Sequence, residues 1–205
     1  MNKTKSTYLA VAALLLSPIA GNAVVIFEIG DAGELLGTEQ NVADNTDLIG
    51  GLLANTTADM FGFSWGGGLL NIAASGTFDT QLSLFDALGI GLIHDDDSGV
   101  GLQALISDVL DAGNYLIAIS AFNYDPQSAG GAIFPTGFPG PFNAIGPGGG
   151  LPLSGWGGDS FAAGGEYAIS FSSVVNSPTV PEPGTLALLG IGLVGMGLAR
   201  RRRKV

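Results

Sequence analysis

The sequence predicts an all-β sandwich for the central part of the chain, residues 24 to 179. The apolar runs there are short, several alternate with polar residues, and none keeps a helical period. Clusters of Gly, Asp and Asn separate the runs, which is typical of turns between strands. The predicted strands are residues 24–29, 60–65, 78–85, 91–93, 103–109, 115–121 and 166–174.

Two of these strands repeat one pattern. Each follows a glycine turn, at Gly113 and at Gly164–Gly165, and each then places large apolar side chains on one face. The apolar positions are Tyr115, Ile117 and Ile119 in the first strand and Tyr167, Ile169 and Phe171 in the second. The repeat predicts two equivalent strands of a sandwich.

The stretch from Asp86 to Gly89 has turn chemistry and predicts a hairpin between strands 78–85 and 91–93. The hairpin lies within the segment FDTQLSLFDALGIGLIHDDDSG, and the segment LDAGNYLIAIS follows it. Together these segments resemble the bacterial pre-peptidase C-terminal domain over residues 58 to 122. The resemblance implies a jelly-roll-like β-sandwich of the kind appended to secreted enzymes and surface proteins, with strand 166–174 closing the sheet.

Residues 134–159 depart from that family because Gly and Pro dominate them. We expect either a long surface loop or a segment that its aromatic side chains pin to the sandwich. Those aromatic residues are Phe134, Phe138, Phe142 and Trp156.

Charge is divided unequally along the chain. All seven Lys and Arg residues lie in the two ends, and of the 18 acidic residues only Glu182 lies outside residues 24–179. A body without basic side chains cannot neutralise phosphates, which excludes nucleic acid as a partner. Cations are its natural partners, so the acids form either a solvated, solubilising surface or a specific divalent-cation site. The absence of cysteine excludes disulfides and thiolate chemistry.

Residues 1–23 have the pattern of a Sec signal peptide. Lys3 and Lys5 precede an apolar run over residues 8–16, and Gly21 and Ala23 are small residues at the recognition positions. We expect cleavage after Ala23, with the Sec translocon and signal peptidase as partners.

Residues 180–205 combine a short motif, an apolar run and a basic cluster. Pro181, Glu182 and Pro183 precede a predicted single transmembrane helix over residues 185–199. A basic membrane stop follows, formed by Arg200, Arg201, Arg202 and Arg203. Basic residues beyond a span stay in the cytoplasm, so the body is expected on the outer side of the inner membrane.

This three-part tail closely resembles the PEP-CTERM sorting signal. The resemblance implies that Pro181, Glu182 and Pro183 are read by an exosortase, a membrane-embedded cysteine transpeptidase-like enzyme, in a Gram-negative bacterium that makes extracellular polysaccharide. The implied route is export, a transient inner-membrane anchor, then the cell surface or the extracellular space. The alternative is an unprocessed anchor.

Candidate reactive groups are few. His94 is the one histidine, and no catalytic residue or enzymatic activity is expected. A Ser/His/Asp arrangement with His94 and a two-carboxylate glycosidase are the alternatives, although a histidine beside three aspartates more often lies in a solvated loop.

Asp95, Asp96 and Asp97 form the best metal candidate, because dense carboxylate oxygens suit Ca²⁺; a solvated acidic turn is the alternative. We therefore expect a non-catalytic structural or binding module of the cell surface or extracellular matrix. An association with exopolysaccharide would use Trp65, Tyr124 and Trp156, although these aromatics could instead be packing residues. A secreted hydrolase and a calcium-dependent carbohydrate-binding module are the alternative functions.

Overall fold

A computed structural model describes residues 23–55, 57–135, 140–158 and 164–173, and in these ranges the regular structure is all β. Within them, no helix has the length and apolar character needed to cross a membrane. The predicted signal peptide, apart from Ala23, and the predicted tail over residues 180–205 lie outside the described residues.

Two sheets make up the fold. The larger sheet has the strand order β1-β3-β12-β4-β7-β5-β6-β10, with β2 paired to β4, and the smaller has the order β11-β8-β9. Neighbours pair antiparallel, except that β1 lies parallel to β3 and β2 lies parallel to β4. The strands are β1 (Val25–Phe27), β2 (Gln40–Asn41), β3 (Leu48–Leu52), β4 (Ala58–Gly76), β5 (Thr80–Asp86), β6 (Gly91–Asp95), β7 (Leu105–Ala121), β8 (Asp125–Ser128), β9 (Gly131–Ala132), β10 (Phe142–Asn143), β11 (Leu153–Gly157) and β12 (Glu166–Ser173).

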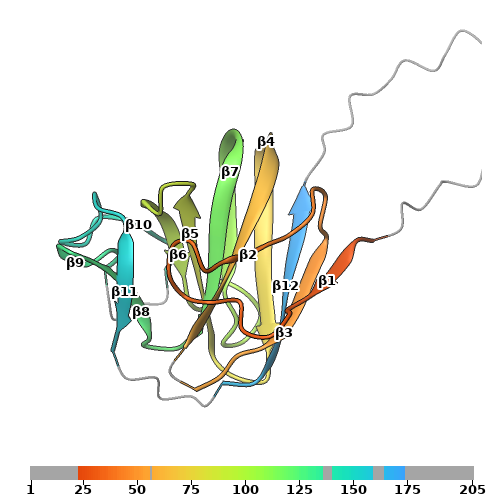
Figure 1. The fold of residues 1–205 in the computed structure, drawn as a ribbon, viewed down its shortest axis with the longest axis horizontal. Helices are drawn as coiled ribbons and strands as arrows, with labels where there is room; N and C mark the ends of the chain where they lie inside the picture. Colours follow the sequence, from red (N-terminus) through yellow and green to blue (C-terminus); the bar gives the residue numbers. More distant parts are fainter. Residues whose placement is uncertain (1–22, 56, 136–139, 159–163, 174–205) are drawn as a thin grey trace, which may run out of the picture.

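The two long strands, β4 and β7, fold the larger sheet over on itself. They remain paired from Ala58↔Ser120 to Ala73↔Leu105, and Figure 1 shows both reaching the same end of the molecule and turning over there. Gly67 and Gly68 lie at this bend with φ of +91° and +106°, values that a side chain would strain. The first half of β4 therefore belongs to one layer with β2, β5 and β6, and its second half to the other layer with β12, β3 and β1.

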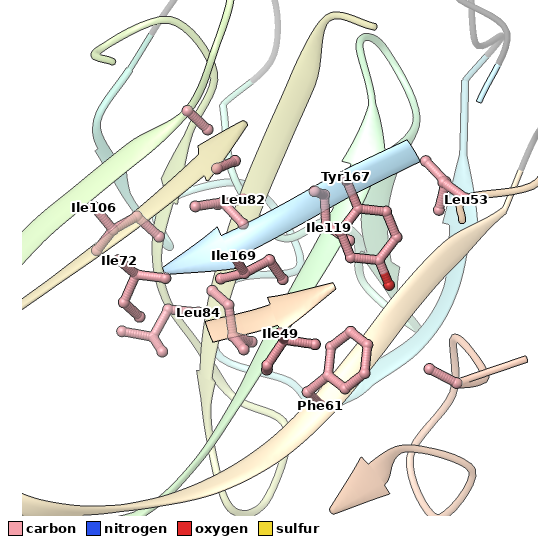
Figure 2. Close-up of a cluster of buried hydrophobic side chains, with 14 of the residues drawn as sticks. Ile49, Leu53, Phe61, Ile72, Leu82, Leu84, Ile106, Ile119, Tyr167 and Ile169 are labelled. Carbon is pink, nitrogen blue, oxygen red and sulfur yellow. The ribbon is translucent and has the colours of Figure 1, made fainter. Parts of the chain in front are cut away.

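The core lies between these layers. Phe61 from the first half of β4 and Ile72 from the second half are fully buried in one cluster, which also includes Ile49 of β3 and Ile119 of β7. Figure 2 shows the side chains of both layers meeting there. Such a two-layer arrangement is the β-sandwich predicted from the sequence.

The repeated pattern of the sequence is confirmed in this core. Ile117, Ile119, Tyr167 and Ile169 are buried in the cluster, and Tyr115 and Phe171 pack against it. The predicted turn at Gly113 is wrong, however. Gly113 pairs with Trp65 inside a continuous ladder, so the predicted strands 103–109 and 115–121 are two ends of the single strand β7.

A second apolar cluster covers the outer face of the first layer. Phe85 and Leu116 from the sheet pack there against Ile133, Phe134 and Leu153. Phe134 and Leu153 belong to the Gly- and Pro-rich segment and Ile133 directly precedes it, so the described part of this segment packs against the sandwich rather than leaving it. Its glycines permit close backbone approach: a Cβ on Gly149 would collide with the carbonyl oxygen of Ala144.

Candidate metal centre

Asp95, the first of the three predicted calcium ligands, has a structural role. Its buried carboxylate accepts hydrogen bonds from the backbone N–H and the hydroxyl of Ser98, at 3.1 and 2.5 Å, and from the backbone N–H of Leu105, at 2.7 Å. These bonds hold the connection between β6 and β7 in place. Asp95 therefore does not contribute to the group of carboxylates that Asp96 and Asp97 join.

That group is completed by Asp79, in the turn between β4 and β5. Asp79, Asp96 and Asp97 each present one carboxylate oxygen, and the three oxygens lie within 4.8 Å of one another. Each residue also has an Oδ1 atom that is shielded from solvent and has no hydrogen-bond partner among the described residues. Sequence reasoning found Asp96 and Asp97 from their clustering but missed Asp79, whose only signal was its place in the FDT run at the start of the predicted strand 78–85.

Two further oxygen donors lie near this group. Gln81 is two residues beyond Asp79 along β5, is only 4% exposed, and has an unpartnered Oε1 atom. Asp125, at the start of β8, is hydrogen-bonded to Gln81 and interacts electrostatically with Asp96. The buried side of the β6–β7 loop is therefore rich in acceptors, and the sequence from residue 24 to 179 contains no Lys or Arg to pair with them.

This environment opposes ionisation. Burial, followed by the charges of Asp97, Asp79, Asp95 and Asp125, raises the pKa of Asp96 to about 7. Burial, and then the charge of Asp97, also raises the pKa of Asp79. Burial raises the pKa of Asp125, and its hydrogen bond from Gln81 acts in the opposite direction. An arrangement of this kind is stabilised by a bound proton or a bound cation.

A second acidic group, formed by Glu28, Asp31 and Asp59, lies between the N-terminal segment and β4. Glu28 accepts from the backbone N–H groups of Ala32 and Leu52, at 3.1 and 2.9 Å, so it anchors the segment after β1 to the end of β3. Asp59 is 2% exposed, and its Oδ2 atom has no hydrogen-bond partner.

Burial is also the main cause of the unusual titration of Asp59. It raises the pKa of Asp59 to about 7, against the opposing effect of the nearby Tyr167 hydroxyl, and the charges of Glu28 and Asp31 raise it further. The sequence did not predict this group, because Asp59 lies far along the chain from Glu28 and Asp31.

His94 is a core residue, and the expectation of a solvated loop histidine is wrong. It lies in β6, is 4% exposed, and its Nδ1 atom is 2.9 Å from the hydroxyl of Ser83. Phe134 stacks on its ring with centroids 5.2 Å apart, and burial lowers the pKa of His94 to about 4. Ser83 is 1% exposed, so this pair offers no accessible nucleophile.

Of the three aromatics that the sequence singled out for carbohydrate, two serve packing. Trp156 donates from its indole nitrogen to the carbonyl of Glu34 at 2.7 Å and stacks on Tyr124 at 5.7 Å. Trp65 instead lines an open cavity of about 270 Å³ beside the bend of β4. The other lining residues include Asn45, Thr46, Phe63 and Phe171.

Comparison with known proteins adds information about both parts of the chain. Residues 179–204 match the PEP-CTERM protein-sorting motif family. The motif indicates a secreted protein with a C-terminal sorting signal and implies an exosortase as its processing partner, as the sequence predicted. Pro181, Glu182, Pro183 and the basic stop at residues 200–203 fall within this match. No curated protein sequence matches the chain.

Among solved structures, the chain is similar to the pre-peptidase C-terminal domain of a collagenase from Bacillus anthracis. The two are 10% identical, with a TM-score of 0.37, and the similarity covers 65% of this chain and 93% of that one.

Proposed function

We propose that the mature protein is a non-catalytic β-sandwich of the cell surface or extracellular matrix of a Gram-negative bacterium. The single observation that carries this proposal is the sorting motif at residues 179–204, which follows directly after an all-β body. The Sec translocon and signal peptidase would export the chain, residues 185–199 would hold it in the inner membrane, and exosortase would then process the tail.

The composition and burial of the body support a role without catalysis. It contains no Lys, Arg or Cys, and its single histidine is enclosed by Phe134 and Ser83. General acid–base catalysis would therefore depend on carboxylates alone. A hydrolytic activity that disappears on substitution of one carboxylate would overturn this part of the proposal.

The proposed processing predicts the ends of the mature chain. Mass spectrometry of extracellular protein from the native host should find Val24 as the first residue and no peptide containing Arg200. Replacing Glu182 with alanine should leave the full tail attached and keep the protein in the membrane fraction, whereas Ser177→Ala, just outside the matched motif, should be processed normally. Extracellular protein that retains residues 200–205 would contradict the proposal.

A second candidate function, binding to exopolysaccharide, is favoured by the cavity beside Trp65. An indole face and the polar side chains of Asn45 and Thr46 are the chemistry that sugar rings contact. Trp65→Ala should weaken retention on purified host exopolysaccharide by roughly tenfold, which corresponds to about 1.4 kcal/mol. Leu88→Ala, at a residue that is 73% exposed and does not line the cavity, should bind like the wild type. Equal retention of both variants would place any binding away from Trp65, and absence of any binding by the wild type would leave a purely structural role.

A further inference from the structure

Asp79, Asp96 and Asp97 bring three carboxylates together where neither protein donors nor solvent can satisfy them all. The Oδ1 atom of each is shielded from water and has no hydrogen-bond partner in the part of the chain that the structure describes, and Asp96 as a whole is only 3% exposed. An ionised carboxylate in such a position is costly unless a positive charge is bound beside it. The sequence from residue 24 to 179 offers no Lys or Arg for that purpose, so the charge has to come from outside the body.

A proton is the first candidate, but it compensates the group incompletely. One proton removes one of the three charges and leaves the other carboxylates adjacent. The Oε1 atom of Gln81 is an independent sign of a cation. It is a buried neutral acceptor without a partner, next to Asp125 and two residues from Asp79, and a protonated carboxyl group elsewhere in the group does not satisfy it.

The oxygen ligands of this group suit Ca²⁺. Ca²⁺ holds its oxygen ligands at about 2.3–2.6 Å, so two ligands of one ion can be up to about 5 Å apart. The ligand atoms of Asp79, Asp96 and Asp97 all lie within 4.8 Å of one another. Mg²⁺ dehydrates reluctantly and usually keeps several waters, so a group of solvent-shielded carboxylate oxygens suits it less well than Ca²⁺, which takes about six to eight oxygen ligands.

We propose that Asp79, Asp96 and Asp97 bind one Ca²⁺ ion, which ties the β4–β5 turn to the β6–β7 loop, with Gln81 and Asp125 as the neighbouring oxygen donors. Asp95 positions the loop through Ser98 and Leu105 and is not a ligand. This inference deepens the proposed function, since extracellular modules that bind Ca²⁺ with dissociation constants of about 10⁻⁴–10⁻³ M are filled only outside the cell.

The test is calorimetric titration of the full-length chain in detergent with CaCl₂, alongside thermal unfolding in CaCl₂, in MgCl₂ at the same concentration, and in NaCl of matched ionic strength. We expect one site and a rise in Tm specific to calcium, because an ion that binds only the folded state stabilises it. Asp79→Asn and Asp97→Asn should each raise the dissociation constant at least tenfold. Asp59→Asn, in the other acidic group, and Asp108→Asn, on an exposed part of β7, should retain the wild-type response at this site.

Two results would overturn the proposal. One is an equal rise in Tm in all three salts, which is simple screening of charge. The other is a calcium response that Asp59→Asn abolishes and Asp79→Asn and Asp97→Asn preserve, which would assign the ion to the group with Glu28 and Asp31. Folding of each variant is checked by its near-ultraviolet circular dichroism in EDTA. Tail processing is measured separately in the host, so a failure of calcium binding is distinguishable from a failure of the proposed route.

Discussion

Replacing Phe61 with alanine is expected to lower the free energy of unfolding by about 3–5 kcal/mol. Phe61 is completely buried and lies in β4 between the two layers, where Ile49 and Ile169 are in the same cluster (Figure 2). The truncation removes a large apolar side chain and leaves a cavity, because pairing with β2 on one side and β7 on the other prevents this part of β4 from moving inward to fill it.

Urea unfolding of the two proteins in the same buffer is the measurement for Phe61→Ala, with the midpoint expected to fall and the slope to remain similar. Phe27→Ala is the matched control, because the same side chain in β1 is 70% exposed and should cost about 0.5 kcal/mol or less. If the two variants lost similar free energies of unfolding, Phe61 would not belong to the core of the sandwich.

The second large effect is a fall in stability as the pH rises from 4 to 8 in the presence of EDTA. The pKa values of Asp59 and Asp96 are raised in the folded protein from 3.8 to about 7. Between these values the folded state holds more protons than the unfolded state, so stability declines with rising pH. His94 acts in the opposite direction, since its pKa falls from 6.5 to about 4 and its contribution is lost as the pH drops.

The effect of the two carboxyl groups with raised pKa values outweighs that of the one imidazole with a lowered pKa. The free energy of unfolding is therefore expected to fall by on the order of 3 kcal/mol between pH 4 and pH 8. The charged and polar groups around Asp59 are Glu28, Asp31 and the Tyr167 hydroxyl, and those around Asp96 are Asp79, Asp95, Asp97 and Asp125. Asp59→Asn should remove more than half of the net decline, because the opposing contribution of His94 remains, whereas the exposed Asp108→Asn should preserve it. Denaturant unfolding across this pH range is the measurement, and stability that rises steadily to pH 8 would contradict the expectation.

The sequence predicted the sandwich because burial in a two-layer fold imposes a period of two on each strand. Ile117, Ile119 and Ile169 follow that period, and all three are in the core. The same local pattern could not show that β4 and β7 continue through glycine. A glycine in a ladder and a glycine in a turn look alike in sequence, and at Gly113 pairing with Trp65 decides between them.

Strand β3 was missed for a related reason. Its sequence, Leu-Ile-Gly-Gly-Leu, has a low strand propensity, but Gly51 lies where a Cβ would meet the ring carbon and hydroxyl of Tyr167. The close contact of β3 with β12 therefore requires a glycine at residue 51, although glycine lowers the strand propensity of this sequence.

The candidate metal centre shows the same limit. The three consecutive aspartates in the sequence correctly indicated Asp96 and Asp97 as members of the group. Asp95 instead accepts a hydrogen bond from the backbone of Leu105, and only the folded sheet brings Asp79 to the group. The buried position of His94 was likewise invisible in sequence, since Phe134, which covers it, lies in a segment that composition marks as a loop. The local sequence pattern thus predicted that carboxylates form the site, but tertiary contacts determine which carboxylates come together.

The place of β12 within the sheet has a mechanical consequence for the proposed stage at which the C-terminal tail anchors the protein. β12 is an interior strand: residues 166–170 pair with β3, and residues 167–173 pair with β4. A force applied along its axis from the Ser173 end shears two hydrogen-bonded ladders at the same time and cannot unzip them one bond after another. Val25 pairs with Leu48, and Leu48 pairs in turn with Ser170, so the chain enters and leaves the body close together. Tension on the tether is therefore borne by β12 and its two neighbours, while the Phe134 cluster on the far side of the β5 layer remains unstressed.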